Sequence, residues 1–144
     1  MTTKTVDRGL MSGNRPGGST SDPPRGTVIV LDDDRDFRVA AVRALRMEGF
    51  VAEDVADVAG LAVALGRMPV DVIVADSRLA DGTDGWEAAA ALAQQFPRTR
   101  VVHVSAYDAD AIRAVDGTVV EAFVRKGGDP FALVEAVMSV LRGG

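Results

Sequence analysis

The sequence of 144 residues contains no cysteine, which excludes structural disulfides and thiolate metal sites. No apolar run approaches the roughly 18 residues that cross a membrane, and the N-terminus has no apolar signal-like core. The net charge of −5 argues against a protein that binds nucleic acid by itself, because such proteins carry clustered positive charge. These absences predict a cytoplasmic protein that binds neither membranes nor, on its own, nucleic acid.

The first 26 residues differ from the rest in composition. They include the stretch SGNRPGGSTSDPPRG, rich in Gly, Ser and Pro, and almost no large apolar side chains. Such a segment buries too little apolar surface to offset the entropy lost on ordering. We therefore predict a disordered tail over residues 1–26, with a segment that folds on a partner as the alternative. Residues 27–144 have the length of a single domain with its own core.

Strand-like and helix-like patterns alternate from Thr27 onward. Apolar runs rich in β-branched residues predict five strands, at 27–31, 50–55, 70–75, 101–104 and 119–124. Helical spacing and capping residues predict five helices, at about 37–48, 57–65, 85–96, 108–115 and 129–141. This alternation indicates an α/β fold, a doubly wound, flavodoxin-like (βα)5 sandwich in which helices cover both faces of a parallel sheet.

The composition of the strands predicts their order in the sheet. The runs at 27–31, 70–75 and 101–104 are almost entirely apolar, as expected of strands buried on both faces. The runs at 50–55 and 119–124 contain acidic residues and are typical of edges. The predicted order is therefore 2-1-3-4-5. In such a sheet the ligand site lies beyond the carboxyl ends of the strands, at the switch point between strands one and three.

Acidic residues follow both strands at that switch point. The stretch VIVLDDDRDFR places Asp32 and Asp33 directly after the first strand, and VIVADSRL places Asp76 after the third. Carboxylates that converge on one small volume repel one another and raise one another's pKa values. A hard divalent cation with oxygen ligands removes this repulsion, and Mg²⁺ accepts a few carboxylates together with water. We therefore predict a Mg²⁺ site formed by these three carboxylates.

A metal beside a free carboxylate oxygen suggests phosphoryl chemistry. A carboxylate can attack phosphorus when a metal neutralises the charge that otherwise keeps two anions apart. Such a site also needs a hydroxyl and a cation, and the chain places Ser105 after the fourth strand and Lys126 after the fifth. Lys126 is the only lysine in residues 27–144. Its compact charge suits a single phosphoryl oxygen better than a planar guanidinium does.

Four motifs in order, LDDD, VADSRL, VSAY and FVRK, resemble the receiver domain of two-component response regulators over about residues 27–142. By this resemblance Asp76 is the phosphoacceptor. Asp33 is a direct Mg²⁺ ligand, Asp32 acts mainly through a bound water, and the backbone carbonyl of Arg78 completes the protein ligands. Asp34 matches no such role and is instead expected to be an acidic residue at a helix N-terminus.

The resemblance also implies a switch and a partner. Ser105 is the hydroxyl that moves onto the phosphoryl group, Phe123 is the aromatic residue whose rotamer follows it, and Lys126 binds the phosphoryl group. The phosphodonor is a sensor histidine kinase or a histidine phosphotransferase, because His103, the only histidine, is expected to be a structural residue of a strand. The output is a change in the face formed by residues 108–115, 119–124 and 129–141, which controls a partner protein that the sequence does not identify.

Two departures from the family pattern lead to further expectations. Gly127 follows the lysine where the family usually has proline, often with a cis peptide, so we expect a trans peptide here. Arg78 and Tyr107 occupy variable positions that flank the phosphoryl site. Their size leads to the hypothesis that they slow attack by water and lengthen the lifetime of the phosphorylated form.

Only RGG follows Leu141, so the sequence predicts a single-domain response regulator that is a phosphoacceptor for signalling and not an enzyme. Alternatives are a pseudo-receiver scaffold that works without phosphorylation and a phosphate sink in a phosphorelay. A flavodoxin-like cofactor binder is disfavoured because its phosphate loop would contain Ser, Thr and Gly where this chain has aspartates. An aspartyl hydrolase is disfavoured because the chain has no insertion large enough for a substrate cap.

Overall fold

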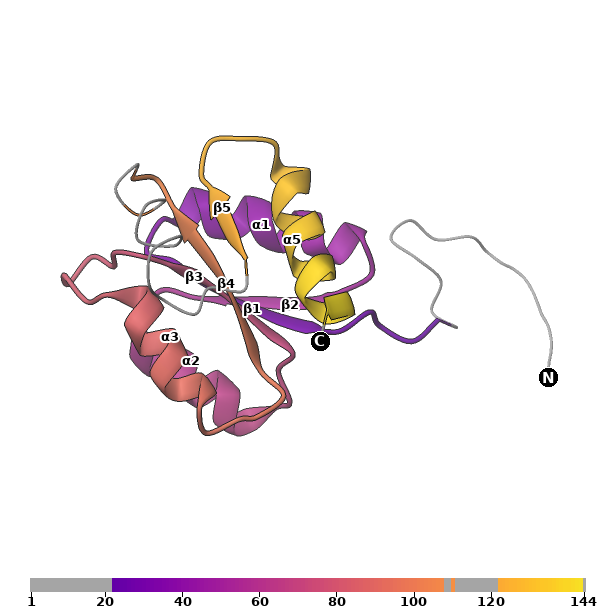
Figure 1. The fold of residues 1–144 in the computed structure, drawn as a ribbon, viewed down its shortest axis with the longest axis horizontal. Helices are drawn as coiled ribbons and strands as arrows, with labels where there is room; N and C mark the ends of the chain where they lie inside the picture. The colour runs from indigo at the N-terminus through magenta and orange to yellow at the C-terminus, as the bar shows by residue number, and fades with distance from the viewer. Residues whose placement is uncertain (1–21, 108–109, 111–121, 144) are drawn as a thin grey trace.

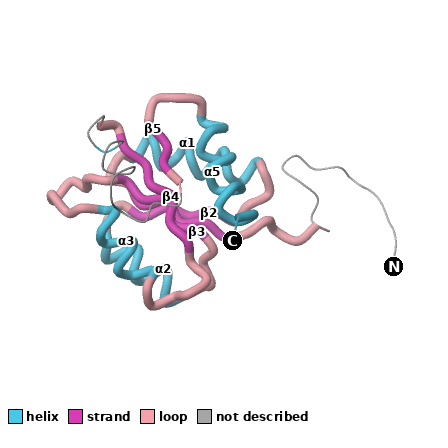
Figure 2. The backbone as a smooth tube through the Cα atoms, viewed as in Figure 1, coloured by secondary structure: helices cyan, strands magenta, loops and turns pink. Residues whose placement is uncertain are grey.

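The computed structural model describes residues 22–107, 110 and 122–143. A parallel sheet of five strands in the order β2-β1-β3-β4-β5 forms its middle layer (Figures 1 and 2). The strands are β1 (Thr27–Leu31), β2 (Val51–Val55), β3 (Val72–Asp76), β4 (Arg100–Ser105) and β5 (Phe123–Arg125). The predicted doubly wound fold and the predicted strand order are both confirmed.

Helices cover both faces of this sheet. The described helices are α1 (Arg35–Met47), α2 (Val58–Arg67), α3 (Gly85–Ala93) and α5 (Pro130–Gly143). One apolar core lies between the sheet and helices α1 and α5, and a second lies between the sheet and helices α2 and α3 (Figure 1). Alternate residues of β1 face the two cores: Val28 and Val30 face the first, Ile29 and Leu31 the second. The central strands are apolar on both sides because each side meets a helix.

Several element boundaries differ from the predicted ones. Helix α3 ends at Ala93 and not at Phe96, because the amides of Gln95 and Phe96 bond to carbonyls three residues back as the chain approaches Pro97. Helix α2 continues to Arg67, two residues beyond its predicted end. The predicted helix over 108–115 and the first part of the predicted fifth strand lie outside the described residues, with the exception of Asp110.

The third strand begins later than predicted and ends on the key aspartate. The apolar run at 70–75 predicted its start at Val70, but β3 begins at Val72 and includes Asp76. The two preceding residues belong to the entry loop, where the carboxylate of Asp71 accepts a hydrogen bond from the amide of Thr27 at 2.8 Å. This side-chain bond holds the loop at the start of the neighbouring strand β1.

Most of the predicted N-terminal tail, residues 1–21, lies outside the described residues. At its C-terminal end, the amide of Arg25 donates to the carbonyl of Gly49 at 3.0 Å, and the amide of Val51 donates to the carbonyl of Gly26 at 2.9 Å. The backbone is therefore held against β2 from Arg25 onward, two residues before the predicted start of the domain.

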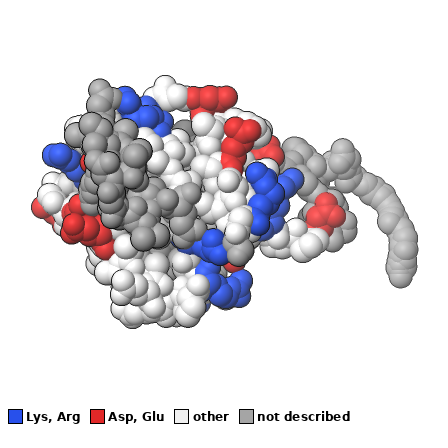
Figure 3. All heavy atoms as spheres, viewed as in Figure 1, with Lys and Arg blue, Asp and Glu red and all other residues white. Residues whose placement is uncertain are grey.

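None of the helices in the described part of the chain is long and apolar enough to cross a membrane. On the face seen in Figure 3, basic and acidic side chains are interspersed over the described residues. The described part of that face carries no continuous basic stripe, and the net charge of the chain is −5.

Candidate phosphoryl and metal site

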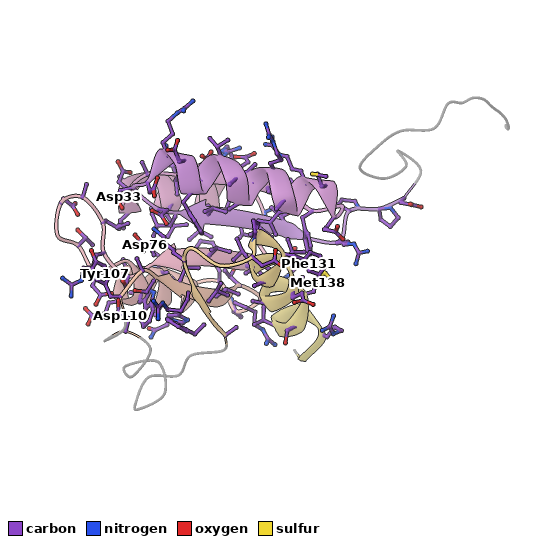
Figure 4. The ribbon with its side chains drawn as sticks, turned by 90° about the horizontal axis from the view of Figure 1, so that it is seen from above. Asp33, Asp76, Tyr107, Asp110, Phe131 and Met138 are labelled. Carbon is purple, nitrogen blue, oxygen red and sulfur yellow. The ribbon has the colours of Figure 1, made fainter. Side chains whose placement is uncertain are left out.

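The carboxyl ends of four strands bring the predicted site residues together. Asp32 follows β1, Asp76 ends β3, Ser105 ends β4 and Lys126 follows β5. All neighbouring strands are parallel, so these ends lie at the same edge of the sheet. Figure 4 shows Asp33 and Asp76 at this end of the molecule. The sequence-based prediction that these residues form one cluster is confirmed, whereas their chemical roles remain predictions.

Three carboxylates form a group suited to a cation. Oxygen atoms of Asp32, Asp33 and Asp76 all lie within 4.8 Å of one another, and only Asp33 is exposed. Oδ1 of Asp32 accepts a hydrogen bond from the Asp34 amide at 2.8 Å, and its buried Oδ2 lies 2.7 Å from the ammonium of Lys126. Three carboxylates this close together, two of them buried, fit a hard divalent cation such as Mg²⁺.

Lys126 supplies the cation of the site. Its Nζ lies 2.7 Å from Oδ2 of Asp32 and 3.5 Å from Oδ1 of Asp76, and it pairs with both by charge. The same ammonium lies 4.8 Å from the centre of the Phe37 ring, where the electron-rich ring face attracts it. Burial alone would lower the pKa of Lys126, but the carboxylates of Asp32 and Asp76 outweigh burial and raise it. Lys126 is therefore held in its charged form.

The two buried aspartates have raised pKa values. Burial, followed by the neighbouring carboxylates of Asp32 and Asp33, raises the pKa of Asp76 to about 7, although Lys126 opposes the shift. Burial also raises the pKa of Asp32, against the opposing effects of Lys126 and the Asp34 amide. The cluster therefore carries more negative charge than Lys126 can neutralise, and a bound cation would favour the ionised carboxylates.

The two oxygens of Asp76 have different surroundings. Oδ1 accepts a hydrogen bond from the amide of Ser77 at 3.0 Å and is the oxygen near Lys126. Among the described residues, Oδ2 receives no hydrogen bond. Oδ2 is therefore the oxygen of Asp76 with fewer contacts among the described residues.

The start of helix α3 supports the strand that carries Asp76. A Cβ atom on Gly85 would lie 2.0 Å from the backbone oxygen of Asp76, so this approach requires glycine. The indole nitrogen of Trp86 donates to the carbonyls of Ala75 and Val104, both at 3.1 Å, and so joins β3 to β4 one residue before each strand ends. The sequence did not predict these roles of Gly85 and Trp86, because the helical pattern of residues 85–96 does not reveal which backbone atoms the helix will contact.

Ser105 lies in a network that includes a residue the sequence did not single out. Its hydroxyl donates to Oδ2 of Asp110 at 2.6 Å and accepts from the Ser77 hydroxyl at 3.2 Å and from the Tyr107 amide at 2.9 Å. Both Ser105 and Asp110 are buried. Asp110 stands five residues after Ser105, and no local sequence signal predicts that its side chain folds back onto the hydroxyl.

The remaining predicted residues lie around the cluster. The guanidinium of Arg78 stacks on the Tyr107 ring, 4.7 Å from its centre, and both side chains are exposed. Phe123 is half-buried in β5 and meets Trp86 edge to face, with ring centres 5.9 Å apart. The described residues contain no cis peptide, which confirms the expectation for Gly127.

Two minor predictions are also confirmed. Asp34 is the N-cap of α1, and its carboxylate accepts hydrogen bonds from the amides of Asp36 and Phe37. His103 is buried within β4 and meets Trp86 edge to face at 4.7 Å, so it has the structural setting that was predicted.

The chain matches a known protein family over most of its length. The model of the response regulator receiver domain matches residues 28–138. The chain belongs to this family. Receiver domains of this kind are the signalling domains of two-component response regulators, and the five-stranded fold described above is the one found in CheY-like receiver domains.

Relatives of the receiver domain include longer regulators. This chain is 34% identical over 132 residues to the probable transcriptional regulatory protein NarL of Mycobacterium tuberculosis, and the match covers 87% of this chain and 59% of that protein. It is 35% identical over 88 residues to the photosynthetic apparatus regulatory protein RegA of Rhodobacter capsulatus, covering 59% of this chain and 46% of that protein. The receiver domain thus spans about half the length of these curated relatives.

A solved structure supports the fold. The response regulator receiver protein from Sinorhizobium medicae superposes with a TM-score of 0.70, at 22% identity, over 81% of this chain and 94% of that one. At this level of identity the likeness establishes the fold of the receiver domain and not the roles of individual residues.

Proposed function

We propose that this domain accepts a phosphoryl group on Asp76 from the phosphohistidine of a sensor histidine kinase or a histidine phosphotransferase, in a Mg²⁺-dependent reaction. The observation that carries this proposal is the convergence of Asp76, two further carboxylates and Lys126 at one sheet edge. The match of the receiver family over residues 28–138 supports the same reaction.

The transfer is an in-line displacement at phosphorus. Oδ2 of Asp76 forms the new bond as the phosphorus–nitrogen bond of phosphohistidine breaks, and the imidazole, protonated at its other ring nitrogen, leaves as a neutral ring with the electron pair of that bond. Lys126, already beside Asp76, pairs with a phosphoryl oxygen. The residues that would hold Mg²⁺ are Asp33, Asp76, Asp32 through water, and the carbonyl of Arg78. Bound Mg²⁺ supplies positive charge that reduces the repulsion between the carboxylate and the incoming phosphoryl group.

The output of the proposed reaction is a change in protein contacts. Ser105 and Phe123 lie on the adjacent strands β4 and β5, so movement of the Ser105 hydroxyl onto the phosphoryl group reaches the surface formed by β5 and α5. We propose that a partner protein in the cytoplasm binds this surface.

Incubation with acetyl phosphate and Mg²⁺, followed by intact-protein mass spectrometry, tests the proposed function. We expect one phosphoryl adduct on the wild type, no adduct on Asp76→Asn, and loss of the adduct when EDTA replaces Mg²⁺. A wild type that stays unmodified would point instead to a scaffold that works without phosphorylation. An adduct that persists on Asp76→Asn would place the phosphoacceptor elsewhere.

The stacked pair of Arg78 and Tyr107 leads to a prediction about lifetime. Their side chains contact each other beside the site, so we propose that they restrict the approach of water to the aspartyl phosphate. Arg78→Ala and Tyr107→Ala are each expected to shorten the lifetime of the phosphorylated form by about threefold to tenfold, the range of a loss of about 0.7 to 1.4 kcal/mol in barrier height. Decay of the adduct after removal of acetyl phosphate measures this lifetime, and unchanged decay in both variants would refute the role.

A further inference from the structure

The hydroxyl of Ser105 has no spare hydrogen-bonding capacity. A serine hydroxyl has one proton to donate and two lone pairs that accept. Here the proton goes to Oδ2 of Asp110 at 2.6 Å, and the lone pairs receive the Ser77 hydroxyl and the Tyr107 amide. To donate to a phosphoryl group on Asp76, Ser105 must therefore break its bond to Asp110. The 2.6 Å distance is that of a hydrogen bond from a hydroxyl to an ionised carboxylate, which is a strong kind of hydrogen bond, and both residues are buried.

We propose that Asp110 is a latch that holds the Ser105 hydroxyl in the unphosphorylated arrangement and thereby sets the energy needed to switch. This inference rests on the proposed function of Asp76. Asp110 acts on the site through the hydroxyl of Ser105, so it is a positioning residue and not a catalytic one. Figure 4 shows Asp110 beside Tyr107 at the same end of the molecule as Asp76.

The latch explains how phosphorylation acts beyond Asp76 itself. A phosphoryl group and the Asp110 carboxylate are both anions that accept hydrogen bonds, and only one of them can take the single Ser105 proton. When the phosphoryl group takes it, Asp110 loses the Ser105 donor and faces a second anion nearby. A polar cavity of about 310 Å³, lined in part by Ser77, Arg78, Asp84 and Asp110, gives the carboxylate space to withdraw. Movement of Asp110 then changes the arrangement of the side chains that line this cavity.

Binding of beryllofluoride, a mimic of the phosphoryl group, tests the latch. The unlatched state is only partly populated in the free protein, and this fraction lowers the apparent affinity for the mimic. Asp110→Asn keeps the shape but weakens the acceptor, and Asp110→Ala removes it. In the presence of Mg²⁺ we expect the affinity to increase about threefold to tenfold for Asp110→Asn and by about tenfold or more for Asp110→Ala, in line with the strength of charged hydrogen bonds. The fluorescence of Trp86, the only tryptophan, reports binding.

Three matched variants distinguish the latch from a general effect of charge or packing. Asp81 lies in the loop after Asp76, and its exposed carboxylate accepts a hydrogen bond from the Thr83 amide. Asp81→Asn removes the same charge as Asp110→Asn, and the affinity of this variant for beryllofluoride should change by less than about twofold. In a Ser105→Ala background, Asp110→Asn and Asp110→Ala should no longer tighten binding, because the bond that they release is already absent.

The outcomes separate the latch from the function on which it depends. If the wild type binds beryllofluoride and both Asp110 variants bind it with unchanged or lower affinity, the latch is wrong while the proposed function stands. The same holds if the gain in affinity survives in Ser105→Ala. If no protein binds the mimic, the wild type included, the proposed function fails and the latch fails with it.

Discussion

Replacement of Lys126 by glutamine is expected to slow phosphoryl incorporation from acetyl phosphate by about 10²- to 10³-fold, the loss typical when one preorganised charge is removed from a developing oxyanion. The ammonium is already in place before the reaction, 3.5 Å from Asp76 and held against Asp32 and the Phe37 ring. It therefore needs no rearrangement to receive a phosphoryl oxygen. The rate of adduct formation, followed by intact mass at saturating Mg²⁺, measures the effect.

Two further variants show whether charge alone is sufficient. Lys126→Arg keeps the charge but replaces a compact ammonium with a planar fork, so it should recover only part of the rate. Arg67→Gln removes the same charge from an exposed ion pair with Glu53 and should leave the rate unchanged. If Lys126→Gln incorporates phosphate at a rate within threefold of the wild type, Lys126 has no part in the transfer.

Asp76→Asn is expected to stabilise the metal-free domain at neutral and alkaline pH, by about 2 kcal/mol in the free energy of unfolding at pH 8. The pKa of Asp76 is about 7 in the folded chain and 3.8 when unperturbed, so the folded state binds the proton more tightly. The stabilising proton is fully present below about pH 4 and is lost as the pH rises through 7. A pKa shift of this size corresponds to at most about 4 kcal/mol in the free energy of unfolding. The variant also loses the ion pair with Lys126, so the net gain in stability is smaller.

Urea denaturation in EDTA over about pH 5 to 8 measures this effect. The wild type should lose stability as the pH rises. The slope of stability against pH should be shallower in Asp76→Asn because residue 76 no longer titrates. Some slope should remain because the pKa of Asp32 is also raised. Mg²⁺ should restore stability at pH 8 in the wild type and restore less of it in the variant. Asp33→Asn removes the same charge from an exposed carboxylate and should give a smaller gain. A wild type whose metal-free stability is constant or rises over this range would contradict the raised pKa of Asp76.

The effects predicted for Lys126→Gln and Asp76→Asn have the same physical cause. Desolvation and mutual repulsion leave the acidic cluster undercompensated, since Lys126 is the only cation paired with Asp32 and Asp76 among the described residues. The excess negative charge lowers stability at this edge of the sheet and favours a bound cation, and one carboxylate oxygen of Asp76 receives no described hydrogen bond. The pKa of Asp76 and the reactivity proposed for it are thus two results of the same burial.

The sequence by itself determined the sheet and the main site residues. Apolar runs with β-branched residues located the strands, and acidic residues in the second and fifth runs distinguished edges from centre. Once the strands are parallel and their order is known, the residues that follow them must meet at one edge. That geometric rule, and not any local feature, allowed Asp32, Asp76, Ser105 and Lys126 to be placed together from sequence.

Only the tertiary structure decided which side chains surround that edge. Asp110 reaches Ser105, Phe37 lies under Lys126, and the indole of Trp86 joins two strands. Each contact depends on the direction in which a side chain leaves its helix or loop and on how closely that element approaches the sheet, as at Gly85. Periodicity fixes which face of an element is buried, but the rotamer and the neighbouring backbone decide which atoms meet, and these are set by packing across the whole fold.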